Sequence, residues 1–234
     1  MIKILLFIIM IFLKNIAYST DDLKPNTCNF VQIDAFLYDY SVINSEDSNQ
    51  SGMNNQIFTV RPGLEMCFKT RHFNLRPNIL LNPFNSSSEG VLLVGKDFKI
   101  AELGLYSSIN YSQKTLGNTS RFNETLENNL LIGPYLYIFP NFSDEDLYEI
   151  FFRLTYQYYL QQATVNGYTT TMSKKNGVNI MLSFLYATFL NETLAFSPSI
   201  NFLYTYSVDM VGGNVGSNTF QLQFFPISFR WYLN

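Results

Sequence analysis

Residues 147–162 read Leu-Tyr-Glu-Ile-Phe-Phe-Arg-Leu-Thr-Tyr-Gln-Tyr-Tyr-Leu-Gln-Gln, and the even and odd positions of this stretch differ in chemistry. The even positions are aromatic or aliphatic from Tyr148 to Leu160, whereas the odd positions include Glu149 and Arg153. A period of two predicts a β-strand with one apolar face and one polar face. A strand of a soluble β-sandwich can alternate in the same way, but it is usually shorter, at about 5–6 residues.

The apolar face of this stretch has the length that a membrane-spanning strand requires. Such a strand needs about 9–11 residues, and Tyr148 and Tyr158 stand at about that spacing. Strands of membrane barrels place aromatic residues at both lipid interfaces on their outer face. The stretch therefore predicts lipid on its apolar side and a polar lumen on the other side.

The N-terminal segment has the pattern of a signal peptide. Lys3 precedes an apolar run at 4–13, and the small residues of Ala17-Tyr18-Ser19 predict cleavage after the serine. We expect residues 1–19 to be the signal peptide and residues 20–234 to form a single barrel domain. The alternative is a transmembrane anchor, but about ten apolar residues are too few for a helix that needs roughly 20.

The composition also favours a membrane protein of the β class. Hydrophobic residues make up 47% of the chain, aromatic residues 17% and charged residues only 14%. Ordinary soluble domains have about 25% charged residues, so the apolar surplus is expected to face lipid. The net charge of −3 argues against a nucleic-acid partner, because such a partner requires a basic surface.

Alternating segments recur along the rest of the chain and predict its strands. They lie at 31–42, 56–70, 73–82, 98–112, 129–140, 147–162, 177–190, 193–208 and 218–233. Val91–Val94 decides the count, because ten strands result if this run is the centre of a strand and nine if it is not. Barrels of single bacterial chains have even numbers, so we expect ten, with eight or twelve as alternatives. The last segment changes phase, which a bulge at Phe225-Pro226 explains.

The polar stretches between these segments predict the connections. We expect long loops at 43–55, 113–128, 163–176 and 209–217, and short turns at 70–72 and 191–192. In the first strand, Leu37 is expected to face outward and Tyr38 inward. Long surface loops that alternate with short periplasmic turns are typical of membrane barrels.

The chain resembles the small bacterial outer-membrane β-barrel proteins. The signal peptide, the alternation through 31–233 and the C-terminal segment Ile227–Asn234 carry the resemblance, and the last of these is similar to the final strand read by the barrel-insertion machinery. Such strands commonly end on an aromatic residue, whereas this one ends Leu233-Asn234. The resemblance implies a porin-like, antiparallel up-and-down transmembrane barrel in the bacterial outer membrane, with outer-membrane lipid and the insertion machinery as partners. Closure is expected because an open sheet edge in lipid leaves backbone groups unpaired.

Catalytic and metal-binding patterns are sparse. His72 is the single histidine and falls in a predicted turn, so a Ser-His arrangement has no base elsewhere in the chain. Two cysteines and scattered acids give no metal-ligand spacing, and no cofactor is expected. The sequence therefore predicts a protein that is not an enzyme.

Inward-facing charges are expected to gather in the lower half of the lumen, nearer the short turns. This group consists of Asp34, Glu65, Lys69, Arg76, Glu102, Glu149, Arg153 and Arg230, with Arg61 just above. The upper half is expected to be lined by Tyr38, Tyr40, Tyr106, Gln157, Tyr159, Thr205, Ser207 and Gln221. Charges confined in an interior are costly unless paired, so the acids and bases should bridge one another. The alternatives are an ordinary filling of a narrow barrel and a plugged base beneath a polar cup.

Cys28 and Cys67 are predicted to form a disulfide. They fall near the periplasmic ends of neighbouring strands and on the lumen phase, and the periplasm is oxidising. Directly opposed residues have Cβ atoms about 4.5–5.5 Å apart, slightly wide for a disulfide, so the strands must shift to allow it. Two free thiols are the alternative.

Two functions follow from this pattern. One is a structural or surface-interaction barrel that contacts partners through its long loops; the other is a narrow channel for small polar solutes. The surface ligand is not specified by the sequence.

Overall fold

The computed structural model describes residues 28, 30–45, 53–82, 87–98, 100–115, 124–140, 146–165, 168–211 and 215–233. The predicted signal peptide at 1–19 lies outside these residues. Across the described ranges, none of the helices reaches the length and hydrophobicity needed to cross a bilayer.

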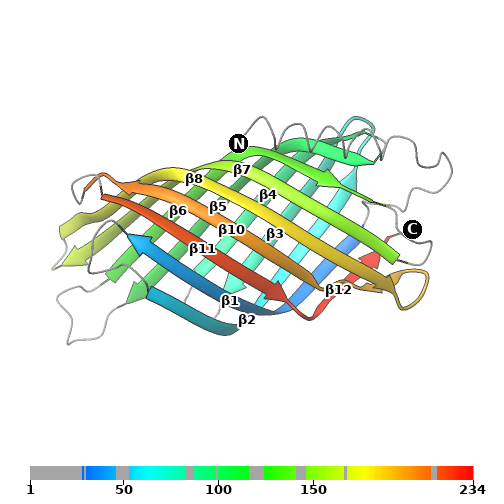
Figure 1. Ribbon diagram of the computed structural model, residues 1–234, viewed down its shortest axis with the longest axis horizontal. Helices are drawn as coiled ribbons and strands as arrows, with labels where there is room; N and C mark the ends of the chain where they lie inside the picture. Colours follow the sequence, from blue (N-terminus) through cyan, green and yellow to red (C-terminus); the bar gives the residue numbers. More distant parts are fainter. Residues whose placement is uncertain are drawn as a thin grey trace.

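The described chain forms one antiparallel sheet (Figure 1). Its strands are β1 Phe30–Ser45, β2 Met53–Lys69, β3 Asn74–Asn82, β4 Ser87–Phe98, β5 Ala101–Thr115, β6 Glu124–Ile138, β7 Asp146–Val165, β8 Tyr168–Phe189, β9 Leu194–Phe196, β10 Ser199–Asp209, β11 Val215–Phe225 and β12 Ser228–Tyr232. Figure 1 shows them running side by side and obliquely between two ends of the molecule. We call the end with the connections 70–73 and 190–193 the turn end, and the opposite end the loop end.

The strand pairing returns to its starting point. Each strand from β1 to β8 pairs with the next, β8 pairs with both β9 and β10, and β1 pairs with β2 on one side and with β11 and β12 on the other. β9 and β10 are two parts of one strand interrupted at Ser197-Pro198, and β11 and β12 are interrupted at Pro226-Ile227. Proline has no backbone N–H for the ladder, which explains both breaks. The bonding order is thus ring-like, over ten strand segments.

The structure explains both irregular features of the predicted strand pattern, the short run at Val91–Val94 and the change of phase near the end of the chain. Val91–Val94 lies in the middle of β4, where Val91 and Leu93 are buried and Leu92 and Val94 are exposed. At the end of the chain, Phe225 and Ser228 are both buried, so the inward phase shifts across Pro226. The sheet is all-β, antiparallel and barrel-like, as the alternation predicted.

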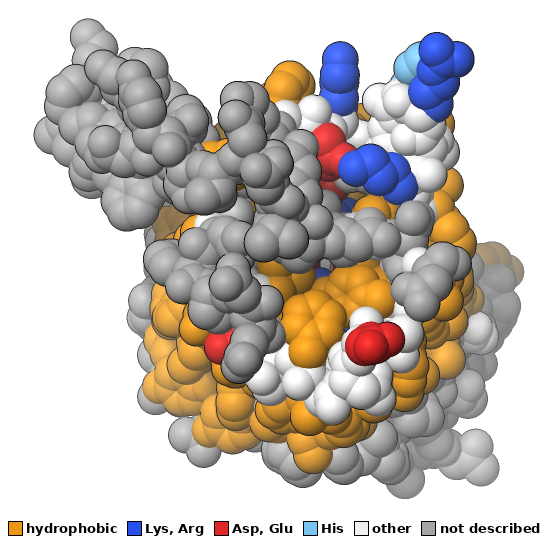
Figure 2. All heavy atoms as spheres, turned by 90° about the vertical axis from the view of Figure 1, so that its right-hand side faces the viewer, with side chains coloured by type: hydrophobic (Ala, Val, Ile, Leu, Met, Phe, Trp, Pro, Cys, Tyr) orange, Lys and Arg blue, Asp and Glu red, His pale blue; other side chains and the backbone are white. Residues whose placement is uncertain are grey.

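The exterior and interior reverse the usual distribution of polar and apolar residues. Large aliphatic side chains are exposed on the outside, among them Leu92, Leu103, Leu105, Ile109, Leu130, Ile132 and Leu154. Arg76, Glu102 and Arg230 are 0–1% exposed in the interior. Figure 2, which faces the turn end, shows hydrophobic side chains over much of the visible outer wall and basic side chains at one side of the rim.

The predicted orientation of the first strand is wrong beyond Asp34. A register shift between Asp34 and Phe36 places a β-bulge in the β1–β2 pair. Leu37 is consequently buried at 3% exposure, and Tyr38 lies opposite Phe224, which is exposed. Because a bulge adds one residue to one strand only, it reverses every later side chain of β1.

Two predicted loops are also wrong in extent. β7 continues to Val165 and β8 begins at Tyr168, so only residues 166 and 167 lie between them instead of the expected loop at 163–176. β5 reaches Thr115 and β6 begins at Glu124, which shortens the expected loop at 113–128. Strand ends that extend beyond the apolar band are polar on both faces. They therefore do not alternate in hydrophobicity, and their composition resembles that of loops.

Candidate functional site

The interior near the turn end holds an ion pair that is completely buried. Arg76 on β3 and Glu102 on β5 meet through Nη2–Oε2 at 3.0 Å and Nε–Oε1 at 3.3 Å. Asn74 donates from Nδ2 to Glu102 Oε2 at 2.7 Å, and the Tyr135 hydroxyl donates to Glu102 Oε1. Three side chains from two strands, β3 and β6, therefore hold the carboxylate, as a buried charge requires.

A second buried ion pair joins strands that are distant in the sequence. Arg230 on β12 donates from Nη1 and Nη2 to the two oxygens of Glu149 on β7, at 2.6 and 3.1 Å. Its Nε donates to Gln32 Oε1 at 3.0 Å. Two parallel bonds from a planar guanidinium give this pair both energy and a fixed orientation.

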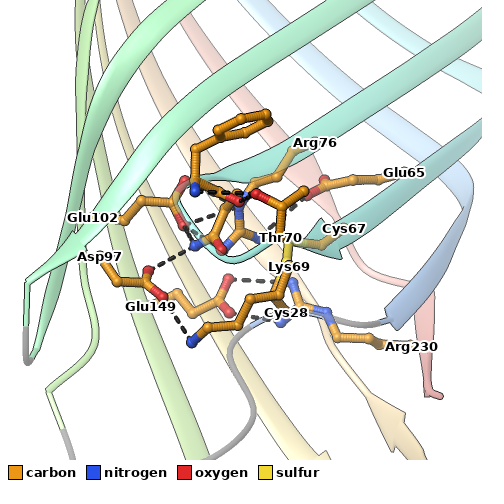
Figure 3. The surroundings of a disulfide bond; sticks show 12 residues. Cys28, Glu65, Cys67, Lys69, Thr70, Arg76, Asp97, Glu102, Glu149 and Arg230 are labelled. Atoms are coloured by element: carbon orange, nitrogen blue, oxygen red, sulfur yellow. Dashed lines mark hydrogen bonds and ion pairs between the residues drawn. A yellow bond between two sulfur atoms is a disulfide. The ribbon is translucent and has the colours of Figure 1, made fainter. Parts of the chain in front are cut away.

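The Phe30 ring lies between the arginines of the two ion pairs, and Tyr137 packs on one of them. The Phe30 ring has Arg230 Cζ at 4.0 Å from its centroid and Arg76 Cζ at 5.6 Å. Tyr137 lies on Arg76, with Cζ 4.7 Å from its ring centroid. A close contact of this kind contributes about 0.5–1 kcal/mol at an exposed site and about 2 kcal/mol when it is desolvated. Phe30 thus connects the two neutralised pairs into one layer, and Figure 3 shows the four charged side chains of these pairs converging.

A disulfide closes the site toward the turn end. Cys28 and Cys67 are joined with their Cα atoms 5.0 Å apart (Figure 3). The backbone partner of Cys67 is Phe30, two residues after Cys28, so the bridge runs diagonally and not between directly opposed residues. It connects the segment before β1 to β2 and packs in the buried cluster that contains Phe30, Leu147 and Tyr232.

The structure brings together only part of the predicted charged group. Glu65 lies 3.9 Å from Arg76 Nη1, and Lys69 pairs with Asp97 at 2.8 Å, where both side chains are partly exposed. Asp34 accepts hydrogen bonds from Gln32 and Ser228 instead of from an arginine. We call Glu65, Arg76, Glu102, Glu149 and Arg230 the charge cluster.

Besides Asp34 and Lys69, two further predicted members are not assigned to the charge cluster. Arg153 stands apart from it, with its guanidinium over the Tyr106 ring at 4.2 Å. The side chain of Arg61 lies outside the described residues. The predicted pairing of Arg153 with the cluster acids is therefore wrong, because its position along β7 places it beside Tyr135 and Met181.

Sequence reasoning missed several members of the site. The alternation predicts that Asn74 faces inward, and Tyr135 and Phe30 have the same inward phase, but it does not match any of them to partners. Asp97 belongs to β4 but lies between Val91–Val94 and the alternating segment that begins at residue 98, so no direction was predicted for it.

Gly95 shows how the local sequence makes room for these contacts. A Cβ there would overlap the Tyr135 hydroxyl and lie 2.8 Å from Glu102 Oε1. Tyr135 lies on β6 and Glu102 on β5. A side chain at position 95 of β4 would occupy the place of the Tyr135 hydroxyl, so glycine is needed there for the tyrosine to reach Glu102.

A cavity of about 400 Å³ lies inside the ring, bounded in part by the charge-cluster residues Glu65, Glu149 and Arg230. Amide side chains line much of it, including Asn78, Asn110, Asn129, Gln157, Asn179, Asn201, Gln221 and Gln223. Tyr106, Gln157, Thr205 and Gln221 line it as expected for the polar upper lumen, while the bulge in β1 places Asp39 there.

Within the described ranges, no three side chains of His, Cys, Asp or Glu gather as a metal site. His72 is exposed in the connection 70–73, where the Thr70 hydroxyl donates to the Phe73 carbonyl oxygen at 2.6 Å.

An apolar exterior, a polar ion-paired interior and a ring-like antiparallel sheet define the fold of the bacterial outer-membrane β-barrel proteins. The outer membrane protease OmpT from Escherichia coli has a TM-score of 0.51 to this chain at 7% identity, over 92% of this chain and 100% of that one. This likeness concerns the fold alone. No protein family model matches the chain, and no curated protein matches its sequence.

Two further solved structures superpose less well. The translocator domain of the autotransporter NalP from Neisseria meningitidis has a TM-score of 0.40 at 10% identity, over 94% of this chain and 93% of that one. Neisserial surface protein A, NspA, has a TM-score of 0.37 at 8% identity, over 87% of this chain and 96% of that one.

Proposed function

We propose that the chain is an integral protein of the bacterial outer membrane, a closed barrel of ten strands whose lower lumen is blocked by the charge cluster. Its role is structural or one of surface interaction. Outer-membrane lipid and the barrel-insertion machinery are its expected partners.

The outer face supports placement in lipid. On β7, Tyr148 and Tyr158 bracket the apolar residues, and Tyr148 packs on Tyr186 of β8 with ring centroids 5.1 Å apart. At about 3.3 Å per residue and a tilt of about 45°, ten residues span roughly 25 Å, the height of the apolar band in such barrels.

The proposal rests on the two buried ion pairs in the lower lumen. Arg76 and Glu102 have side chains that are 0% exposed, and Arg230 and Glu149 are 1% and 2% exposed. An eight-stranded barrel is just filled by its own side chains, so ten strands leave a lumen that one layer of long side chains can close. Opening this layer to solute would separate charges that now neutralise each other.

The loop end supports a role in surface contacts. β8 begins at Tyr168, whereas its neighbour β10 ends at Asp209, which pairs with Lys175, so the β7–β8 hairpin extends beyond β10. Tyr168 near its tip is 79% exposed and Met172 is 45% exposed. A second candidate, a narrow channel for small polar solutes, is favoured by the amide-lined cavity of about 400 Å³.

Conductance separates the two functions. The refolded protein should run differently on a denaturing gel before and after boiling, as folded barrels do. In planar bilayers it should then show conductance close to the lipid baseline. Stable conductance steps from the folded, heat-modifiable protein would instead favour the channel.

A further inference from the structure

Arg153 is a buried cation for which the described residues provide no anionic partner. Its side chain is 6% exposed and lines the cavity. Among the described residues no carboxylate forms an ion pair with it, and its Nε has no hydrogen-bond partner. Burying a guanidinium without an anion is costly, so this position calls for an explanation.

The carboxylates that line the same cavity are engaged elsewhere. Glu149 is held by Arg230, and Glu65 lies near Arg76. Asp34 accepts from Gln32 and Ser228, Asp39 accepts from Gln223 at 3.2 Å, and Glu89 also has an interaction partner. Arg153 therefore differs from the other charged groups around the cavity.

The contact with Tyr106 satisfies only part of the bonding capacity of the Arg153 guanidinium. The ring centroid lies 4.2 Å from Cζ, so the tyrosine covers a face of the planar group. The N–H donors of arginine point outward in the plane, and a ring face does not accept them there. A carboxylate matches this edge, because its two oxygens accept two parallel N–H bonds.

The side chains around Arg153 indicate what a bound carboxylate ligand must carry besides its carboxylate group. Leu93, Leu131 and Phe151 belong to the buried cluster that also contains Tyr106, and Met181 packs against this cluster. Gln157 Oε1 and Asn179 Oδ1, which also face the cavity, are buried without hydrogen-bond partners in the described part of the chain. These oxygens accept hydrogen bonds, so a ligand reaching them must carry a hydroxyl or amine donor.

We propose that the lumen cavity binds a small organic carboxylate, with its carboxylate on Arg153, its apolar body against Leu131 and Phe151, and a donor group toward Gln157. The cavity volume of about 400 Å³ falls within the range of about 300–1,000 Å³ of small-molecule sites. This equilibrium binding goes beyond the proposed function and holds whether or not the lower lumen conducts.

The test uses 4-hydroxybenzoate as the probe and 4-hydroxybenzyl alcohol as its uncharged analogue, titrated calorimetrically into the refolded full chain in micelles. The wild type should bind the carboxylate and bind the alcohol at least about tenfold more weakly, since a charged hydrogen-bonded partner is lost. R153Q should weaken carboxylate binding by about tenfold or more. Equal binding of both probes, or no binding of the carboxylate to the wild type, overturns the proposal.

Lys175 provides a matched control. Its Nζ lies 5.9 Å from the Tyr159 ring centroid, and it does not line the cavity. K175Q removes the same charge from a similar cation and tyrosine pair, so its affinity should stay within about twofold of the wild type. If R153Q gives no heat-modifiable band and is therefore not folded, R153K replaces it in the titration. Lysine keeps the charge but loses the bidentate geometry. R153K should bind several-fold more weakly, and affinity equal to the wild type overturns the proposal.

Discussion

Arg230 and Glu149 lie 81 residues apart in the sequence, yet two hydrogen bonds of 2.6 and 3.1 Å join them inside the sheet. Both side chains are almost completely buried, so each is the counter-ion that makes the other tolerable in the interior. Removing either member leaves an uncompensated charge in the buried layer of the lumen.

Replacing Arg230 by serine should therefore raise conductance and give it cation preference. The change shortens a long side chain and leaves Glu149 without its cation, and acidic constrictions select cations. Single-channel recording at one salt concentration measures the effect. Arg71→Ser is the control, because Arg71 is exposed in the connection 70–73 and lies outside the charge cluster. Equal conductance of R230S and the wild type would show that the charge cluster does not limit flow.

Gly95→Ala should disrupt the same layer by a steric route. The new Cβ would overlap the Tyr135 hydroxyl and crowd Glu102, so the tyrosine must leave its hydrogen bond. We expect a lower temperature for loss of the heat-modifiable band. Gly90→Ala on the same strand is the matched control, because the nearest atom to its Cβ would be 4.0 Å away. If both variants melt like the wild type, Gly95 is not required for the packing of Tyr135.

The disulfide should stabilise the lower end of the barrel. Cys28 and Cys67 are separated by 39 residues, for which the chain-entropy model gives about 4 kcal/mol. A double Cys→Ser variant should therefore lose its heat-modifiable band at a lower temperature than the unreduced wild type. Titration of the unreduced, denatured wild type should find no free thiol. Two reactive thiols would contradict the bond.

Protease accessibility should report the orientation of the barrel. Arg121 falls in the sequence segment predicted as a long surface loop, whereas Arg71 lies at the turn end. Trypsin added to intact cells is expected to cut after Arg121, and the Arg121→Gln variant should lack that fragment. Cleavage after Arg71 should appear only in lysed cells. A cut after Arg71 in intact cells would invert the topology.

The sequence by itself determined which face of most strands is apolar. The period of two is a local property, so residues 147–162 and Val91–Val94 could be assigned without knowing their neighbours. The phase shift at Pro226 was also visible, because the alternation changes parity on its two sides. These features were enough to specify an antiparallel, barrel-like sheet with a polar interior.

Only the tertiary structure decided which inward residues meet. Arg153 and Arg230 both have the inward phase, but the strand registers place one over Tyr106 and the other on Glu149. The bulge between Asp34 and Phe36 likewise depends on how β1 fits β2, and it replaced Tyr38 by Asp39 in the cavity wall. Alternation fixes the direction of a side chain, whereas contact between distant strands depends on their relative shift, which every ladder around the sheet sets together.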